Sequence, residues 1–192
     1  MAKMGFYYNQ DTCIGCRTCQ MACKDKNDLP QGIVFRNLRD FEVGEYPTLT
    51  AYHYAATCNH CESPMCVAVC TTGALYIDDE DGTVQLDSSK CDGCQACVEQ
   101  CPYGVPQFNE ETNTAMKCDA CIQLREAGED PACVAACPMR ALEFGPIEDL
   151  RKAHPDAVSD IAILPDSSGT KPCTIVDVKA SALEKDYEEI WL

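Results

Sequence analysis

The chain has 192 residues, of which 46% are apolar and 17 are cysteines, and its formal net charge is −16. A chain of this length can bury a core without disulfide staples, so we expect one or two compact domains. An excess of 31 acidic over 15 basic residues would repel phosphate backbones and anionic lipid, so no nucleic-acid partner is expected.

Neither a targeting segment nor a direct membrane span is expected. No apolar run approaches the roughly 18 residues that a span requires. Residues 1–5 (MAKMG) lack the apolar core of a signal peptide. The cysteines are therefore expected to meet the reducing cytosol, where disulfides are rare, and an odd number of them cannot pair completely. This indicates that they bind something through their thiolates.

All the cysteines except Cys173 fall into four groups. In chain order the groups are Cys13, Cys16, Cys19 and Cys23; Cys58, Cys61, Cys66 and Cys70; Cys91, Cys94, Cys97 and Cys101; and Cys118, Cys121, Cys133 and Cys137. Groups one and three share one spacing and carry Gly15 and Gly93 at the same place. Groups two and four share a longer match, between residues 64–70 and residues 131–137. We predict a duplicated unit that carries one group of each kind.

The spacing in groups one and three predicts iron–sulfur clusters. Two residues between successive cysteines put three sulfurs on one tight loop, and group three followed by Pro102 matches the bacterial ferredoxin run. In that run the fourth cysteine ligates the other cluster of a pair. Gly15 and Gly93 would let the loop backbone approach the inorganic sulfides. Sixteen ligands suffice for four [4Fe–4S] clusters, which would bring the net charge to about −24.

A structural zinc protein is the alternative interpretation, because four-cysteine zinc sites also use pairs separated by two residues. Such sites usually take two sulfurs from each of two distant pairs, whereas two of these groups supply a triplet. Four basic residues beside the cysteines would either raise particular cluster potentials or lie at the surface. They are Arg17, Lys24, Lys90 and Lys117.

Short strands are predicted around the first three groups. Residues 5–8 form a strand before group one. Alternating apolar positions predict an extra hairpin between residues 25 and 57, a segment without any grouped cysteine. Residues 74–77 and 83–86 flank an acidic turn that ends in Asp-Gly, which predicts a second hairpin.

Three elements are predicted after group four. Residues 141–144 form a strand, and residues 147–156 contain a short helix ended by Pro155. Ser181 and Glu184 form a capping box, which predicts a C-terminal helix. One face of that helix would carry Leu183, Tyr187, Ile190 and Trp191. This face would either cover the protein's own core or dock on a partner.

The predicted fold class is α+β, with two bacterial-ferredoxin-like, two-cluster units. The hairpin between groups two and three joins them into one unit, so groups one and four must form the other. The predicted boundaries are residues 1–50 with 112–150 for the outer unit and 51–111 for the inserted unit. Residues 151–192 are a C-terminal extension, expected to contact another subunit.

The remaining candidates suggest no catalytic site. His60 lies between two cysteines, but sixteen thiolates leave no vacancy, so we expect it beside a cluster or at the surface. His53 and His154 show no partner pattern, and Cys173 is expected to pack as a small apolar residue. No catalytic triad, paired carboxylates, P-loop or dinucleotide fingerprint occurs. We therefore expect a non-catalytic protein.

Several motifs resemble the iron–sulfur electron-transfer subunit of the dimethyl sulfoxide reductase family. They are Gly5-Phe6-Tyr7-Tyr8 leading into the first cysteines, Ser63-Pro64-Met65-Cys66, Cys101-Pro102-Tyr103-Gly104, and residues 141–147. The resemblance covers about residues 5 to 155 and weakens after Asp156. It implies a large catalytic subunit with a molybdopterin-type cofactor (Mo or W), and a membrane anchor that meets the quinone pool. It also implies a peripheral place on the cytoplasmic membrane, with the side left open.

The resemblance also implies four sets of ligands. These sets are Cys13, Cys16, Cys19 and Cys137; Cys58, Cys61, Cys66 and Cys101; Cys91, Cys94, Cys97 and Cys70; and Cys118, Cys121, Cys133 and Cys23. Nitrate-reductase relatives lose one ligand to Trp and hold a three-iron cluster, whereas every position is Cys here. Lys24 and Thr71 depart from the proline that follows the fourth cysteine elsewhere.

The function predicted is an electron relay in anaerobic respiration. Electrons would pass through four [4Fe–4S] clusters between a quinol-side partner and the molybdopterin subunit, whose substrate the sequence leaves open. The alternatives are a free-standing polyferredoxin, which differs only in its partners, and the zinc module.

Overall fold

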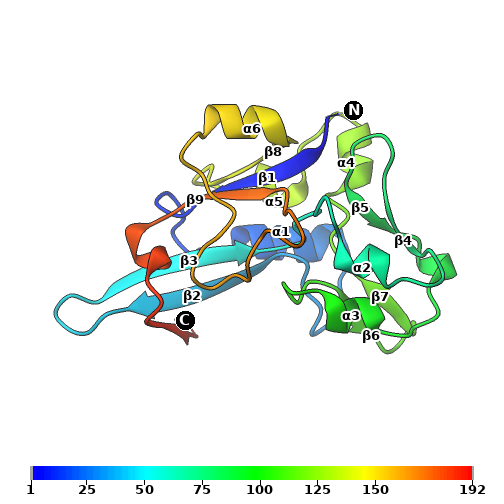
Figure 1. Ribbon diagram of the computed structural model, residues 1–192, viewed down its shortest axis with the longest axis horizontal. Coiled ribbons are helices and arrows are strands. Elements are labelled where there is room, and N and C mark those ends of the chain that lie inside the picture. The colour runs from blue at the N-terminus through cyan, green and yellow to red at the C-terminus, as the bar shows by residue number, and fades with distance from the viewer. Residues whose placement is uncertain (1, 192) are drawn as a thin grey trace.

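The computed structural model describes residues 2–191 and has a mixed α+β architecture of small sheets and short helices (Figure 1). This agrees with the predicted class. A long hairpin projects from one end of the molecule, and residues 65–116, with their short helices and small hairpins, lie at the other end. None of the helices among these residues is long and apolar enough to cross a membrane.

A three-stranded sheet brings together strands that are far apart in the sequence. Its order is β8-β1-β9, in which β1 pairs antiparallel with β8 and parallel with β9. The strands are β1 (Met4–Asn9), β8 (Leu142–Pro146) and β9 (Thr174–Asp177). Phe6, Tyr7 and Tyr8 are all buried, because neighbouring elements cover both faces of β1. The strands predicted at residues 5–8 and 141–144 are confirmed.

Helix α6 (Ile147–Ala153) follows β8 directly and covers one face of this sheet (Figure 1). Ile147 and Leu150 are its buried residues, and they pack with Tyr7 and Cys173. The helix ends before Pro155, as predicted. Cys173 has no exposed surface and has the packing role expected of it.

The predicted extra hairpin is confirmed as β2 (Asn37–Val43) and β3 (Thr50–Ala56). Phe41 on β2 stacks on Tyr52 of β3, with ring centroids 5.2 Å apart, and neither residue is exposed. Aromatic cross-strand pairs of this kind stabilise a hairpin. The Phe41–Tyr52 pair therefore helps to hold β2 and β3 together.

The predicted C-terminal helix is wrong. Residues 180–183 form a single 3₁₀ turn, η2 (Ala180–Leu183), and β10 (Tyr187–Ile190) then pairs antiparallel with β2. Strand pairing satisfies the backbone, and Glu189 accepts two hydrogen bonds from Arg39 at 2.6 and 2.7 Å. These contacts with β2 outweigh the local preference of the sequence for a helix, which would form its hydrogen bonds within the segment itself. The predicted apolar face does not form, since Trp191 is 94% exposed.

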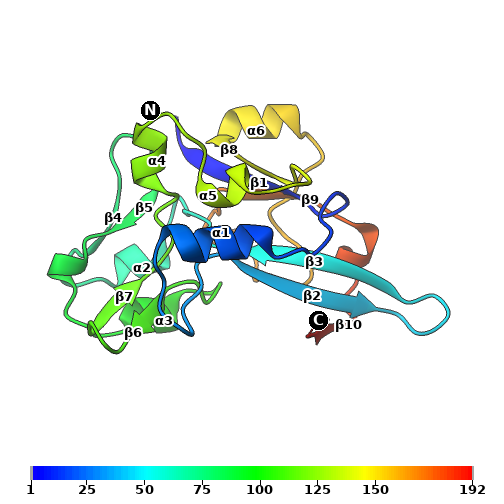
Figure 2. The same ribbon diagram turned by 180° about the vertical axis from the view of Figure 1, so that it is seen from behind.

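Two small hairpins and six short helical elements surround the cysteines. The predicted hairpin is confirmed as β4 (Leu75–Ile77) and β5 (Val84–Leu86), and a further one, not predicted, is formed by β6 (Gln107–Asn109) and β7 (Thr114–Met116). The helical elements are α1 (Thr18–Lys26), α2 (Met65–Ala68), η1 (Ser88–Lys90), α3 (Ala96–Gln100), α4 (Ile122–Glu126) and α5 (Ala132–Ala135). Helix α1 packs on α5, which brings groups one and four together (Figure 2).

Replacing Gly5 with Ala should destabilise the central sheet. A Cβ atom at this position would lie 2.2 Å from the Cys173 carbonyl oxygen and 2.9 Å from the Ile147 Cδ1 atom. Strand β1 and the segment entering β9 would have to separate, at a cost of about 1–3 kcal/mol. Anaerobic thermal unfolding should show a lower midpoint. Gly169→Ala is the matched control, because no atom lies within 4 Å of its Cβ position, and an equal loss in both variants would contradict this account.

Candidate cluster sites

The loops of groups one and three have the same backbone shape. Gly15 and Arg17 have positive φ values of 71° and 60°, and Gly93 and Gln95 have 76° and 60°. Arg17 and Gln95 then begin helices α1 and α3. The repeat seen in the sequence is therefore a repeat in structure. Glycine suits positions 15 and 93, because a residue without a Cβ atom adopts a positive φ without steric cost.

Groups two and four also match each other. His60 and Ala120 occupy equivalent positions between the first two cysteines of their groups, with φ values of 43° and 55°. Pro64 and Pro131 begin helices α2 and α5, which carry the third cysteines. The longer sequence repeat thus forms the same turn and helix twice.

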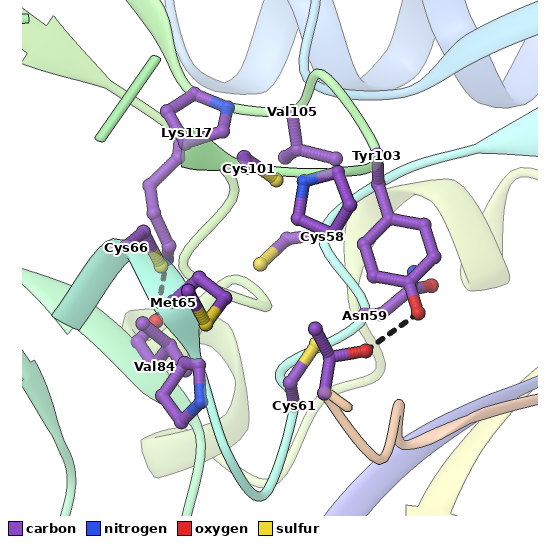
Figure 3. A pocket seen from close by; sticks show the side chains of 14 residues that line it. Cys58, Asn59, Cys61, Met65, Cys66, Val84, Cys101, Tyr103, Val105 and Lys117 are labelled. Carbon is purple, nitrogen blue, oxygen red and sulfur yellow. Dashed lines mark hydrogen bonds between the residues drawn. The ribbon is translucent and has the colours of Figure 1, made fainter. Parts of the chain in front are cut away.

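One cavity is lined by cysteines of two groups (Figure 3). Cys58, Cys61 and Cys66 of group two stand around it with Cys101 of group three. Tyr103 lies at its wall, where the Tyr103 hydroxyl and the Thr170 hydroxyl are 2.7 Å apart. The cavity has little polar surface other than these groups. It is a thiol-lined space bounded by apolar side chains.

A second cavity has the same construction at the junction of groups one and four. Cys13, Cys16 and Cys19 line it together with Cys137. Its other walls include Leu38 and Leu142. Each cavity therefore takes three sulfurs from one group and a fourth from another.

The remaining eight cysteines also neighbour each other across groups. Burial raises the pKa of the Cys97 thiol, and the nearby Cys91, Cys94 and Cys70 raise it further. Burial also raises the pKa of Cys23 to about 12, with further contributions from Cys133 and Cys121. Cys70 thus lies beside group three, and Cys23 beside group four.

Within residues 2–191, no three His, Cys, Asp or Glu side chains converge tightly enough to hold a single metal ion.

Backbone N–H groups donate to several of the sulfurs. Four such bonds have donor–acceptor distances of 3.3–3.4 Å: Leu75 to Cys70, Ala115 to Cys91, Ala120 to Cys118, and Ala141 to Cys137. Hydrogen bonds of this kind favour the thiolate and hold a ligand in place. The cysteines are thus oriented by the surrounding backbone.

The predicted basic residues have different environments. Lys90 forms an exposed ion pair with Asp87 at 3.0 Å, and Lys24 donates to the carbonyls of Pro30 and Ile33. Lys117 is buried and donates to the carbonyls of Val84 and Cys118. Lys117 alone among the four is therefore a buried charge.

A chain of contacts from Arg17 through Asp40 and His53 supports the group-one loop. Its guanidinium pairs with Asp40 and donates to the Leu38 carbonyl at 2.7 Å. The other Asp40 oxygen lies 2.6 Å from His53 Nδ1. The His53 ring in turn packs directly against Gly15.

The other two histidines are held by separate contacts. His60 is fully buried, and its Nδ1 atom accepts a hydrogen bond from the Val84 N–H at 3.0 Å. Burial and the nearby Lys117 hold the His60 pKa well below its usual value, so the ring is neutral. His154 lies away from the cysteines and stacks on Tyr7.

Sequence reasoning missed one charged residue, Arg36. It is only 2% exposed, and its Nη2 atom donates to the Cys133 sulfur at 3.3 Å. Its Nε atom and the His60 Nε2 atom are buried without a partner. The sequence gives one indication that Arg36 is buried: it lies in the same alternating series of positions as Val34 and Leu38. A buried cation beside thiols, with donor capacity to spare, fits an anionic metal–sulfide group.

The fold and the cysteine loops together define a ferredoxin-type iron–sulfur protein. Two family models agree: a 4Fe-4S dicluster domain matches residues 49–147, and a 4Fe-4S binding domain matches residues 4–25.

Comparison with curated relatives identifies the family within this class of iron–sulfur proteins. The protein is 40% identical to the B subunit of anaerobic dimethyl sulfoxide reductase from Escherichia coli (strain K12) over an alignment of 188 positions, which covers 94% of this sequence and 91% of that subunit. Identity to the same subunit of Haemophilus influenzae is 38%, over 92% of this sequence and 89% of the relative. Protein NrfC of Escherichia coli (strain K12) is 39% identical over 77% of this sequence and 67% of its own length.

The chain belongs to the family of iron–sulfur subunits represented by the B subunit of dimethyl sulfoxide reductase. The resemblance inferred from the sequence motifs is therefore confirmed. The alignment with the Escherichia coli subunit extends beyond residue 155, so the similarity includes part of the C-terminal extension.

Replacing Gly15 with Ala should impair metal loading at the group-one loop. The new Cβ would lie 2.6 Å from the His53 Cε1 atom, and the φ of +71° adds strain. Gly128→Ala is the control, because its φ is +78° but nothing lies within 4 Å of its Cβ position. We expect less iron per chain in G15A, whereas G128A should keep its iron and lose about 1 kcal/mol of stability. Unchanged iron in G15A would contradict the role given to this loop.

Proposed function

We propose that the chain holds four [4Fe–4S] clusters and relays electrons between a quinol-side membrane anchor and a molybdopterin-dependent catalytic subunit. When bound, such clusters accept and donate single electrons. The observation that carries the proposal is the crossed arrangement of the sulfurs, in which three cysteines of one group meet a fourth from another.

The proposed ligands form four sites. Site 1 consists of Cys13, Cys16, Cys19 and Cys137; site 2 of Cys58, Cys61, Cys66 and Cys101; site 3 of Cys91, Cys94, Cys97 and Cys70; and site 4 of Cys118, Cys121, Cys133 and Cys23. The two lined cavities support sites 1 and 2. The neighbouring thiols around Cys97 and Cys23 support sites 3 and 4. Sites 1 and 4 would belong to the outer unit (residues 1–50 with 112–150), and sites 2 and 3 to the inserted unit (51–111).

Thiols of different sites that shift one another's pKa suggest a linear order of the sites. Cys19 of site 1 neighbours Cys133 of site 4, and burial together with these thiols raises the Cys19 pKa to about 11. Cys118 of site 4 neighbours Cys58 of site 2. Cys66 of site 2 neighbours Cys97 of site 3. We infer the order 1–4–2–3.

Exposure supports the same order. Cys16 of site 1 and Cys94 of site 3 are exposed, whereas every cysteine of site 4 is buried. A relay needs accessible ends and an insulated middle, because partners must approach the end sites closely. Sites 1 and 3 are therefore the proposed points of electron entry and exit.

The partners are proposed from family membership together with the surface. Ile14 and Met139, on the wall of the site-1 cavity, are 59% and 42% exposed, and Met21 on α1 is 59% exposed. Exposed apolar side chains grouped at one end suit a protein contact. The chain would lie on the cytoplasmic membrane only through such partners and would carry no catalytic site.

Metal analysis of the anaerobically purified protein tests the cluster proposal. We expect about sixteen iron atoms and as many acid-labile sulfides per chain, together with visible absorption. Iron well below that value would refute four clusters, and four zinc ions without visible absorption would indicate a structural zinc protein. Purification without a molybdopterin subunit would favour a free-standing polyferredoxin.

Crossed ligation predicts which cysteine variants behave alike. If Cys70 serves site 3, C70S should alter the same electron paramagnetic resonance signal as C91S, although Cys70 belongs by sequence to group two. C58S should alter a different signal. C173A should leave every signal unchanged, because the Cys173 side chain packs with Tyr7 and Ile147 and belongs to none of the four ligand sets. Identical changes in C70S and C58S would contradict the crossed assignment.

A further inference from the structure

Arg36 is a buried cation without a carboxylate partner. Its side chain enters the core ahead of β2 and is 2% exposed. Among residues 2–191, the ion pairs with Asp or Glu involve other basic residues, and none includes Arg36. Burying an unpaired charge costs several kcal/mol, so something anionic must compensate it.

The neighbours of Arg36 come from two of the proposed sites. Its Nη2 atom donates to the sulfur of Cys133, a site-4 residue, and Cys118 of the same site also lies near. Cys19 of site 1 also lies near the guanidinium, and Ala55, whose carbonyl accepts from Arg36, lines the site-1 cavity. The guanidinium therefore lies near both site 1 and site 4.

The remaining contacts of Arg36 fix it in place without neutralising it. Its Nη1 atom donates to the Ala55 carbonyl at 2.8 Å, and the guanidinium carbon lies 4.8 Å from the centroid of the Phe6 ring. Its Nε–H group has no partner.

The other partly or fully buried cations differ from it. Arg17 and Arg125 pair with Asp40 and Asp81, and Lys117 donates to two backbone carbonyls. Arg36 alone among these donates to a proposed ligand sulfur and keeps a donor to spare.

We propose that Arg36 is a positioning residue that raises the reduction potentials of the clusters in sites 1 and 4. The inference rests on the proposed function, since it needs clusters in those sites. A fixed positive charge stabilises the reduced cluster, which carries one more negative charge than the oxidised cluster. Donation to a ligand sulfur acts in the same direction. Because a guanidinium stays protonated, the effect persists across the working pH range.

The test is an anaerobic redox titration of the intact complex, followed by electron paramagnetic resonance with signals assigned through single cysteine variants. In Arg36→Gln and Arg36→Met the midpoint potentials of sites 1 and 4 should fall, and that of site 3 should stay unchanged. Arg36→Lys keeps the charge and should retain most of the wild-type potential. Arg39→Gln is the matched control, because Arg39 is a half-exposed arginine three residues further on, paired with Glu189.

Unchanged potentials in fully loaded R36Q or R36M would overturn the proposal, as would an equal fall in R36K and the neutral variants. The neutral variants could instead load only sites 2 and 3. In that case full loading of R36K would support the charge requirement, and equal loss in R36K would refute it. Low iron in the wild-type protein would refute the proposed function itself, which keeps the two failures distinct.

Discussion

The fold depends on one constraint, namely that sulfurs far apart in the sequence must meet. Cys137 lies on the wall of the cavity that the Cys13 loop forms, and Cys101 does the same for the Cys58 loop. Hydrophobic burial alone would not require these pairings, because each helix near the cysteines has only four to nine residues. Helices this short are not stable on their own. The proposed clusters, each bonded to sulfurs of two groups, would hold such small elements together.

Charge is the second theme of the structure. The chain is acidic overall, yet Arg36 and Lys117 lie buried among the cysteines. Anionic clusters would offset both residues, which otherwise carry a large desolvation cost. His60 stays neutral in the same region and contributes a hydrogen-bond acceptor rather than a charge. The interior is thus arranged for added negative charge, whereas nearly all the carboxylates other than that of Asp40 lie at the surface.

Local patterns predicted the elements that have local causes. The turn that ends in Asp-Gly specified β4 and β5, and Pro155 ended α6. The C-terminal segment could not be predicted in this way, because β10 exists only through its pairing with β2, about 145 residues earlier in the chain. The hairpin of β6 and β7 was missed because its turn, residues 110–113, lacks the Asp-Gly signal that marks the turn between β4 and β5. Arg36 could not be recognised either, since its role depends on Cys133, which is remote in sequence. The cysteine spacing was informative because ligand geometry is encoded within a few residues.

An anaerobic experimental structure with iron anomalous scattering would test the central claim most directly. The account predicts four separate iron densities, each bounded by three cysteines of one group and one of another, arranged in the order 1–4–2–3. Arg36 would lie near the densities of sites 1 and 4. Fewer than four densities, or a density bounded by all four cysteines of a single group, would contradict it.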